Sequence, residues 1–508
     1  MNYLIGIDVG TSATKTVLFD EAGQVMSSAS EEYPMYQPYN GWAEQKPEDW
    51  RDAVLHTISR VIEKSGVSKE DIKGIGISGQ MHGLVMLDEA GEVIRPSIIW
   101  CDQRTGKEVE DMLNIMPQEK WIEITANPPL TGWTAAKILW VRKNEPDNYA
   151  RCRHILLPKD YIRYVLTGVF ATEVSDASGM QLLDVPGRCW SQKVLKALDI
   201  DESLLGTVYE SCEVTGTILP EIAEKTGLSS ETKVVGGAGD NAAAAVGTGV
   251  VKDGTAFTTI GTSGVVFAHS SQVTIDPRGR VHTCCCAVPG AWHVMGVTQG
   301  AGLSLKWFKD QFCQDYVAEA EKQGVDVYDL INKDVAEIPA GSDRLIYLPY
   351  LMGERTPHLD PDCRGVFFGL SAIHTKAHLL RAVMEGVSYS LSDCNDILQE
   401  MGITVDSMMA CGGGGKSPVW RQMLADMYGC EVKTIAQTEG PALGVAILAG
   451  VGCGIYESVE SACEKLITDN ETAGPDVKMT ELYDEYHQLY KKLYTDLKDS
   501  YKILASLQ

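Results

Sequence analysis

The chain has 508 residues, with 69 acidic and 44 basic side chains that give a formal net charge of −25. Apolar residues make up 44% and charged residues 22%, the proportions of a soluble globular protein. Nucleic acid and anionic membrane surfaces are excluded as main partners, because binding them requires clustered Lys and Arg. No apolar run approaches the roughly 18 residues of a membrane span. The 14 cysteines form no C-x-x-C pair, so we expect free thiols in a reducing, cytoplasmic setting.

The first half of the chain alternates patterns typical of strands and helices. Two short strands are predicted over residues 3–9 and 15–19, around a Gly-Thr-Ser turn. A hairpin turn follows at Asp20-Glu21-Ala22-Gly23. Further strands are predicted over residues 72–78 and 233–236, and helical periodicity covers residues 47–65, 134–144 and 160–166.

The second half repeats this plan. Gly10-Thr11-Ser12 recurs as Gly261-Thr262-Ser263, 251 positions later, and each copy lies between β-rich apolar segments. The repeat predicts two lobes built on one plan. Strands over 256–260, 344–348 and 407–410 alternate with helices over 379–398, 418–428 and 440–449. A long final helix over 480–507 is expected to bury one face, made of Leu482, Tyr486, Leu489, Leu493 and Leu497.

The two Gly-Thr-Ser turns are candidate phosphate loops. Glycine lets the backbone approach a phosphate, while the hydroxyls and amides of the turn donate to its oxygens. Asp8, at the end of the first strand, would hold Mg²⁺ opposite those oxygens. The alternative for each turn is a plain hairpin connection.

Asp240-Asn241 follows a glycine-rich strand end and opens an alanine-rich helix. A carboxylate at that position can accept a proton from a substrate hydroxyl as its oxygen attacks phosphorus. The structural alternative is that Asp240 is the N-cap of the helix.

Two polar segments at strand ends are candidates for binding a sugar. Gln80, Met81 and His82 lie between two glycines after the strand over 72–78. The run from Gly74 to Gly79 fits G-x-G-x-x-G, but its glycines occupy the strand and no helix follows, so a dinucleotide site is rejected. Asp102 and Arg104 either contact a polyol or pair with each other.

Residues 410–417, Ala-Cys-Gly-Gly-Gly-Gly-Lys-Ser, miss a Walker A loop by one residue. They lie between a predicted strand and a predicted helix. Four glycines at such a place allow a flat ring or a phosphate to approach the backbone closely. An adenosine platform is therefore expected here, with a flexible turn as the alternative.

Together these motifs resemble the FGGY family of carbohydrate kinases, from Gly6 to about Gly450. Two long stretches, GWTAAKILWVRKN at 132–144 and GVFFGLSAIHTKAHLLRAVME at 365–385, are similar to the signatures of that family. Several segments look most like those of its xylulose-phosphorylating members: ISGQMHGLVMLD at 77–88, IIWCDQRT at 98–105, LPKDYIRYVLTG at 157–168, GGAGDNAAAAVG at 236–247 and LPYLMGERTPHLDP at 348–361.

The resemblance implies an α/β fold of two actin-like (ribonuclease H-like) ATPase lobes, residues 1–245 and 246–508, with the active site in the cleft between them. It implies Asp240 as catalytic base and Asp8 as the carboxylate associated with Mg²⁺–ATP. It also implies sugar-binding residues, Gln80, Met81, His82, Asp102, Asp240 and Asn241. The implied ATP-binding residues are Gly10, Thr11, Ser12, Lys15, Gly261, Thr262, Ser263, Gly413, Gly414 and Ser417. Gly415-Lys416 departs from the Ala-Arg of many relatives, which leaves the purine contacts open.

The expected activity is ATP-dependent phosphorylation of D-xylulose to D-xylulose 5-phosphate, with ATP and Mg²⁺ as cofactors and a homodimer as the expected assembly. One alternative is the same chemistry on gluconate, ribulose, glycerol or an alditol. Another is a non-catalytic actin-like ATPase or sugar sensor, against which stand Asp240 and the Met81-His82 pair.

Overall fold

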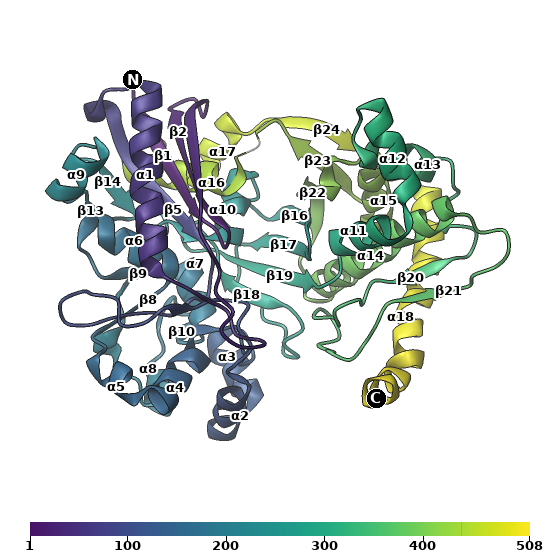
Figure 1. Cartoon of the computed structure of the whole chain (residues 1–508), viewed down its shortest axis with the longest axis horizontal. Helices are drawn as coiled ribbons and strands as arrows, with labels where there is room; N and C mark the ends of the chain where they lie inside the picture. The colour runs from purple at the N-terminus through teal and green to yellow at the C-terminus, as the bar shows by residue number, and fades with distance from the viewer. Residues whose placement is uncertain (438, 508) are drawn as a thin grey trace.

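The computed structural model describes residues 1–437 and 439–507. Each half of the chain forms one mixed β-sheet surrounded by helices (Figure 1). This confirms the α/β class and the prediction of two lobes. Within the described residues, no helix is long and apolar enough to cross a membrane.

The first sheet has the strand order β13-β14-β5-β1-β2-β3, with β15 also paired to β5. β1 pairs antiparallel with β2 and parallel with β5, so the Gly-Thr-Ser turn at 10–12 joins two antiparallel neighbours. The strands are β1 Tyr3–Val9, β2 Ala13–Asp20, β3 Val25–Glu32, β5 Ile72–Gly79, β13 Val214–Thr217, β14 Lys233–Val235 and β15 Ala238–Gly239.

The second sheet, in the order β18-β19-β17-β16-β22-β23-β24, repeats this topology. β16 pairs antiparallel with β17 and parallel with β22, as β1 does with β2 and β5. The second Gly-Thr-Ser turn therefore occupies the equivalent place, between β16 and β17. The strands are β16 Gly254–Ile260, β17 Gly264–Ser270, β18 His282–Cys285, β19 Trp292–Thr298, β22 Val405–Cys411, β23 Glu431–Ile435 and β24 Asp469–Ala473.

Five short strand pairs connect the loops: β4 Glu44–Gln45 with β7 Ser97–Ile98, β6 Val85–Leu87 with β8 His154–Leu156, β9 Ala171–Glu173 with β12 Thr207–Tyr209, β10 Leu183–Asp184 with β11 Cys189–Trp190, and β20 Ile346–Leu348 with β21 Val366–Phe368.

The helices of the first half are α1 Pro47–Ser65, α2 Gly106–Ile115, α3 Gln118–Thr125, α4 Thr134–Asn144, α5 Pro146–Arg151, α6 Pro158–Thr167, α7 Val174–Ala177, α8 Gln192–Leu198, α9 Pro220–Thr226 and α10 Asp240–Gly247. Those of the second half are α11 Gly302–Phe312, α12 Gln314–Gln323, α13 Val327–Ala336, α14 Lys376–Glu400, α15 Pro418–Tyr428, α16 Gly440–Gly452, α17 Val459–Leu466 and α18 Val477–Ser506.

Helix α1 shows how local sequence sets these boundaries. It begins at Pro47, carries Glu48 and Asp49 in its first turn and ends before Gly66, which is left-handed. Proline fits the first turn of a helix, acidic residues favour the positive end of its dipole, and glycine adopts the left-handed cap without strain. The prediction of a helix over 47–65 is confirmed.

Helix α16 comes from the second half of the chain but packs on β1 and β5 of the first sheet, and against α10. The contact is backbone to backbone. A Cβ added to Gly6 would lie 1.9 Å from the carbonyl oxygen of Ala442, and one added to Gly76 would lie 1.9 Å from that of Val445. Glycines in these strands therefore serve helix packing, consistent with the rejection of a dinucleotide motif. The proposed division at residues 245 and 246 stays a prediction.

The buried face of α18 differs in part from the predicted one, since Leu493 is buried as predicted and Tyr486 and Leu497 are partly buried against the same cluster. Its buried residues are Tyr483, His487, Tyr490, Leu493 and Tyr501, whereas Leu489 is 40% exposed. The Tyr483 hydroxyl donates to Oε1 of Glu385 on α14 at 3.0 Å. The register of α18 is thus set by aromatic side chains with polar partners, which a count of leucines misses.

We predict that Gly76→Ala destabilises the protein, because the added methyl group cannot avoid the Val445 carbonyl. Overpacking of this kind costs about 1–3 kcal/mol or more, so thermal denaturation should show a melting temperature lowered by at least about 2 °C. Gly106→Ala is the matched control, since a Cβ at that exposed position meets nothing within 4 Å. Equal melting temperatures for the two variants would contradict the packing argument.

Candidate active site

The carboxyl ends of three neighbouring parallel strands meet at one edge of the first sheet. Asp8 of β1 lies opposite Ser78 of β5, and Ser78 lies opposite Ala238 of β15. Asp240 follows two residues after Ala238, at the start of α10. Ligands of open α/β sheets bind at such edges. The structure therefore brings together Asp8, the segment Gln80–His82 and the pair Asp240-Asn241.

Asp8 is close enough to Asp240 to influence its ionisation. Burial raises the pKa of Asp240 to about 6, and the negative charge of Asp8 contributes to the rise, while hydrogen bonds from Asn241 oppose it. Burial also raises the pKa of Asp8, opposed by the nearby hydroxyl of Ser78 and the charge of Lys15. A carboxylate with a pKa near 6 is suited to accept a proton at neutral pH.

The capping alternative for Asp240 is not what the structure shows. The N-cap of α10 is Gly239, and Asp240 is the first residue of the helix. Its Oδ1 accepts hydrogen bonds from the backbone N–H of Asn241 at 2.7 Å and from the Asn241 side chain at 3.0 Å. The role of Asp240 as a base and of Asn241 as a sugar ligand stays a prediction.

The surroundings of Asp8 suit a divalent cation. Its Oδ1 is buried and accepts no hydrogen bond from the described residues. A second carboxylate, Asp240, adds negative charge at the same edge. Carboxylate oxygens are the ligands that Mg²⁺ takes in phosphate-binding sites. These features fit the predicted role of Asp8 as the residue that would hold Mg²⁺, which stays a prediction.

Gln80 is connected to the first Gly-Thr-Ser turn. Its Nε2 donates to Oε1 of Gln45 at 2.7 Å, and Nε2 of Gln45 donates to the carbonyl of Thr11 at 2.7 Å. The indole N–H of Trp100 donates to the Thr11 hydroxyl at 2.9 Å. These bonds fix the turn's backbone and leave Ser12 exposed. A phosphate contact by Gly10, Thr11 and Ser12 stays a prediction.

Met81 and His82 lie beside the start of α10. Met81 is buried against Gly239, where an added Cβ would meet its Cγ at 2.9 Å. His82 has a left-handed backbone, with φ of 68°, and its Nδ1 lies 2.8 Å from the carbonyl oxygen of Gly179. Burial lowers the pKa of His82 to about 3, so its imidazole is neutral at physiological pH.

Helix α4 supplies residues that the sequence motifs did not single out. The His82 ring stacks on Trp133 with ring centroids 4.8 Å apart. The His82 carbonyl accepts hydrogen bonds from the Thr134 hydroxyl at 3.1 Å and from Nζ of Lys137 at 2.8 Å. Burial lowers the pKa of Lys137 to about 7. The similarity of residues 132–144 to a family signature is the signal that could have found these residues.

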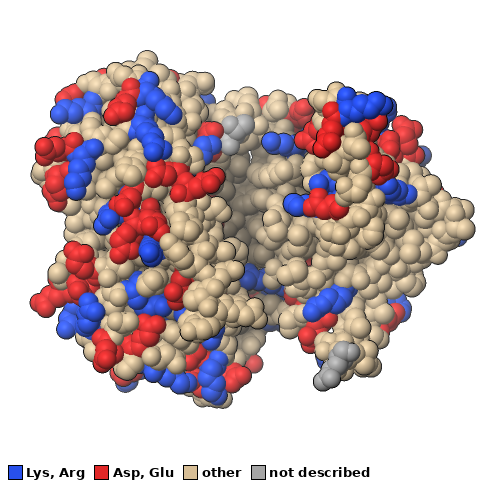
Figure 2. Space-filling view, in the orientation of Figure 1, with Lys and Arg blue, Asp and Glu red and all other residues tan. Residues whose placement is uncertain are grey.

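Side chains of the second half reach the same aromatic group. The His282 ring lies 5.6 Å from that of Trp133, centroid to centroid. Burial lowers the pKa of His282 to about 4, and the positive charge of Arg355 contributes. His282 lies outside the motifs found in the sequence, whereas Arg355 lies within the family-like segment 348–361, and only the fold brings both near His82. Figure 2 shows a deep groove between the two halves, walled mainly by uncharged side chains.

Asp102 pairs with Arg104, as one of the two sequence interpretations proposed. It is fully buried, and Nη2 of Arg104 lies 2.7 Å from its Oδ2. The backbone N–H of Ala43 donates to the same oxygen at 2.6 Å. The Arg104 guanidinium also covers the ring of Trp42 at 3.6 Å. A sugar contact by Asp102 stays a prediction.

The second Gly-Thr-Ser turn is held by the start of α11. Gly302 N–H donates to the Gly261 carbonyl at 2.7 Å, while Thr262 and Ser263 remain exposed. Lys15, the remaining candidate on the first lobe, is 44% exposed at its side chain and forms an ion pair of 2.5 Å with Glu439. ATP contacts by these residues stay predictions.

The glycine run after β22 is required by packing as well. A Cβ on Gly414 would lie 2.5 Å from Cγ2 of Ile260, and one on Gly412 would lie 2.8 Å from its carbonyl oxygen. Gly413 alone faces open space. Ser417 is the N-cap of α15, and its hydroxyl also donates to Asn332 at 2.8 Å. The flexible-turn alternative does not describe this segment, and its contact with adenosine stays a prediction.

Comparison with known proteins decides the family. The model of the N-terminal domain of the FGGY family of carbohydrate kinases matches residues 3–247, and that of the C-terminal domain matches residues 256–453. The chain belongs to the FGGY family of carbohydrate kinases. Kinases of this family use ATP, and the paired sheets are the family's actin-like fold.

Three similar FGGY proteins are informative. A xylulose kinase of Bacillus subtilis is 39% identical over 508 residues, which cover 100% of both chains. A gluconokinase of Bacillus subtilis is 32% identical over 466 residues, 92% of this chain and 90% of that protein. The crystal structure of a ligand-bound xylulose kinase from Lactobacillus acidophilus has a TM-score of 0.92 at 28% identity, covering 99% of this chain and 100% of that one.

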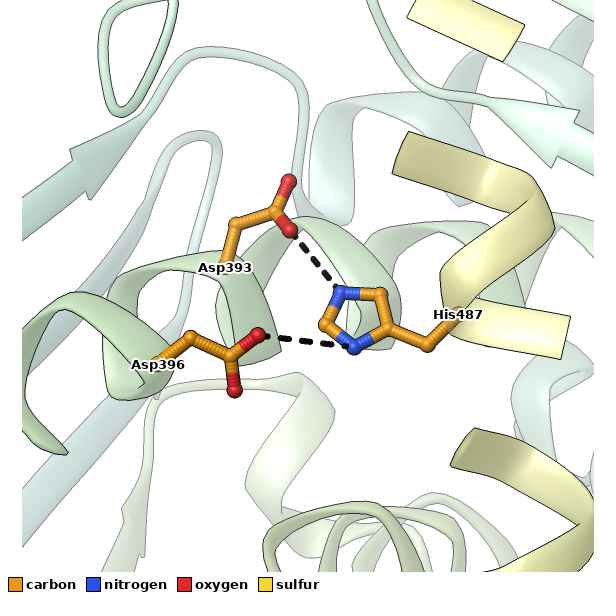
Figure 3. Close-up of side chains that lie close together, drawn as sticks. All are labelled: Asp393, Asp396 and His487. Atoms are coloured by element: carbon orange, nitrogen blue, oxygen red, sulfur yellow. Dashed lines mark hydrogen bonds and ion pairs between the residues drawn. The ribbon is translucent and has the colours of Figure 1, made fainter. Parts of the chain in front are cut away.

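One further group of metal-ligating side chains occurs in the described part of this FGGY kinase: Asp393, Asp396 and His487. Nε2 of His487 lies 2.8 Å from Asp393, and Nδ1 lies 3.8 Å from Asp396. Figure 3 shows the two carboxylates at different ring nitrogens of His487. The group joins α18 to α14.

The Asp8–Asp240 repulsion predicts a pH effect in this FGGY kinase. In the wild type, kcat/KM should fall as pH drops through about 6, because Asp240 becomes protonated and cannot accept a proton. In Asp8→Asn the repulsion that raises the pKa of Asp240 is gone, so the acid limb should move to lower pH, whatever the remaining rate.

The pH dependence of kcat/KM should be measured at subsaturating Mg²⁺–ATP. The profile then reports the free enzyme, in which Asp8 has no cation bound. Asp199→Asn, at an exposed position, is the control and should keep the wild-type limb. An acid limb of Asp8→Asn that coincides with that of the wild type would show that the two carboxylates do not interact.

Proposed function

We propose that this kinase transfers the γ-phosphoryl group of Mg²⁺–ATP to the 5-hydroxyl of D-xylulose. The observation that carries the proposal is the Asp240 carboxylate, with a pKa near 6, at the carboxyl edge of the first sheet beside Asp8. Full-length similarity to a xylulose kinase supports the choice of sugar.

In this proposal Asp240 accepts the proton of the attacking hydroxyl. Met81 and His82 hold the sugar against the strand edge, with the His82 ring fixed by Trp133. The two Gly-Thr-Ser turns bind the phosphates through amides and hydroxyls, one from each lobe. Mg²⁺ held by Asp8 would neutralise charge on the transferred phosphoryl group.

Electrostatics favour a neutral sugar. His82 and His282 are uncharged at neutral pH, and the two carboxylates Asp8 and Asp240 lie at the same edge. An aldonate would bring a further negative charge toward this pair, with Arg355 as a positively charged group within reach of both imidazoles. The preference between a ketose and gluconate therefore depends on whether the attraction of Arg355 for the gluconate carboxylate is weaker or stronger than its repulsion by Asp8 and Asp240.

The substrate is tested by measuring ADP release over D-xylulose, D-ribulose, D-gluconate, glycerol and a C5 alditol. We expect the highest kcat/KM for D-xylulose. A higher kcat/KM for gluconate would indicate a gluconokinase activity. It would also show that attraction to the Arg355 charge outweighs repulsion by the two carboxylates. No rate with any sugar would support a non-catalytic role.

Asp240→Asn should reduce turnover at least about 10²-fold, because the amide cannot accept the hydroxyl proton. Mg²⁺–ATP affinity, measured by calorimetry, should change little, since Asp240 is assigned to the sugar and not to the nucleotide. The matched Asp-to-Asn control at Asp199 should turn over like the wild type. Normal turnover of Asp240→Asn would remove this residue from the base role.

A further inference from the structure

A cluster of buried charges lies beneath the strand edge that carries Asp240. Its members are at most 1% exposed: Lys159, Asp160, Arg163, Glu173 and Asp176. Nζ of Lys159 lies 2.9 Å from Asp160, 3.3 Å from Glu173 and 3.2 Å from Asp176. Burying so many charges is expensive, and apolar side chains of similar volume are often as stable or more so.

The segment before Asp240 has almost no side chains that could fix its position. Residues 236–239 read Gly-Gly-Ala-Gly, so they offer the surrounding protein one methyl group and a backbone. Glycine backbone is also the most flexible. Gly237 has a φ of 75°, and a Cβ there would lie 2.0 Å from the carbonyl oxygen of Ile77. The segment is therefore required to be glycine-rich, and its position must be fixed by other residues.

Besides the pairing of β15 with β5, four hydrogen bonds hold this segment, the first from the Gly236 N–H to the carbonyl of Glu213 at 2.9 Å. Nη1 of Arg163 donates to the Gly236 carbonyl at 2.7 Å. The Gly237 N–H donates to the carbonyl of Ser211 at 2.9 Å. The Gly239 N–H donates to the hydroxyl oxygen of Ser175 at 3.1 Å. The last bond is made one residue before Asp240.

Glu173 orients the two serines. It accepts hydrogen bonds from the Ser175 hydroxyl at 2.7 Å and from the Ser211 hydroxyl at 2.8 Å. It also accepts from the backbone N–H of Ser175 and of Asp176, each at 2.8 Å. A hydroxyl has one proton to donate, so the bond to Glu173 leaves the Ser175 lone pairs to face the Gly239 N–H.

We propose that Ser175 and Glu173 are positioning residues for Asp240, and that the buried charges hold Glu173 so that it can orient both serines. This inference rests on the proposed base role of Asp240. A displacement of about 1 Å of a reacting group can cost on the order of 10²-fold in rate. Loss of the Ser175 hydroxyl should therefore lower kcat, although Ser175 is not among the residues proposed to contact substrate or nucleotide.

The test compares Ser175→Ala with Ser178→Ala. Both serines are fully buried, and both hydroxyls accept a hydrogen bond from a backbone N–H, that of Gly239 at 3.1 Å and that of Cys285 at 3.0 Å. The same atom is removed from the same part of the fold. The Ser175 hydroxyl donates to the Glu173 carboxylate and the Ser178 hydroxyl to the Val174 carbonyl, each at 2.7 Å, so Ser175→Ala should lower the melting temperature at least as much as Ser178→Ala does. Ser175 alone contacts the segment that ends at Asp240.

We expect Ser175→Ala to lose at least about 10-fold in kcat with an unchanged KM for Mg²⁺–ATP. The acid limb of its pH–rate profile, near pH 6, should also shift, because Asp240 is displaced relative to Asp8. Ser178→Ala should keep kcat within about 2-fold of the wild type and keep the acid limb. Equal kcat values for the two variants would overturn the proposal.

Two further measurements keep the test decisive. If Ser175→Ala does not fold, Ser211→Ala replaces it, because that change removes only the donor to Glu173 and keeps the Ser211 carbonyl. A kcat of Ser211→Ala equal to that of Ser178→Ala would then overturn the proposal. Asp240→Asn is measured alongside: normal turnover there contradicts the base role itself, whereas an inactive Asp240→Asn with a fully active Ser175→Ala contradicts only the positioning role.

Discussion

The parallel pairing of β5 with both β1 and β15 is the constraint on which the site depends. This single strand fixes the separation of Asp8 from Asp240, because Asp8 is in register with Ser78 and Asp240 follows Gly239, which is in register with Gly79. Glycines in β1 and β5 also allow the backbone of α16 to lie directly against these two strands. Helix α16 of the second half thus packs on β1, β5 and α10, and β1 and α10 carry the two carboxylates.

Placing two carboxylates together in a protein of net charge −25 works against binding a polyphosphate. The chain compensates locally. Exposed hydroxyls of Ser12, Thr262 and Ser263 lie on turns whose backbones are fixed by neighbouring residues, and Asp8 leaves a buried oxygen without a hydrogen-bond donor from the described residues. In the proposed mode of ATP binding, a bound cation and these donor groups would supply the attraction in place of a basic surface, which is consistent with the mainly uncharged groove of Figure 2.

Much of the fold followed from local sequence, since the helices over 47–65 and 134–144 and the repeated turns carry their own signals. The strand-end residues Asp8, Gln80–His82 and Asp240 could be grouped because strand ends share an edge. Other features depend on contacts between distant segments. The face of α18 is set by Tyr483 and His487 meeting α14, and the glycines near 412–415 by contact with Ile260. No periodicity or motif reports such contacts.

The sugar side of the site also depends on how the two halves meet. His82 belongs to the first sheet, but its ring stacks on Trp133, which in turn contacts His282 from β18. Burial by these neighbours keeps both imidazoles neutral, and the charge of Arg355 acts in the same direction. β18 is itself tied to the first half, because the backbone N–H of Cys285 donates to the Ser178 hydroxyl at 3.0 Å and the Asn127 side chain donates to the Thr283 carbonyl at 2.8 Å. A strand of the second sheet thus completes the surroundings that keep the His82 and His282 imidazoles neutral.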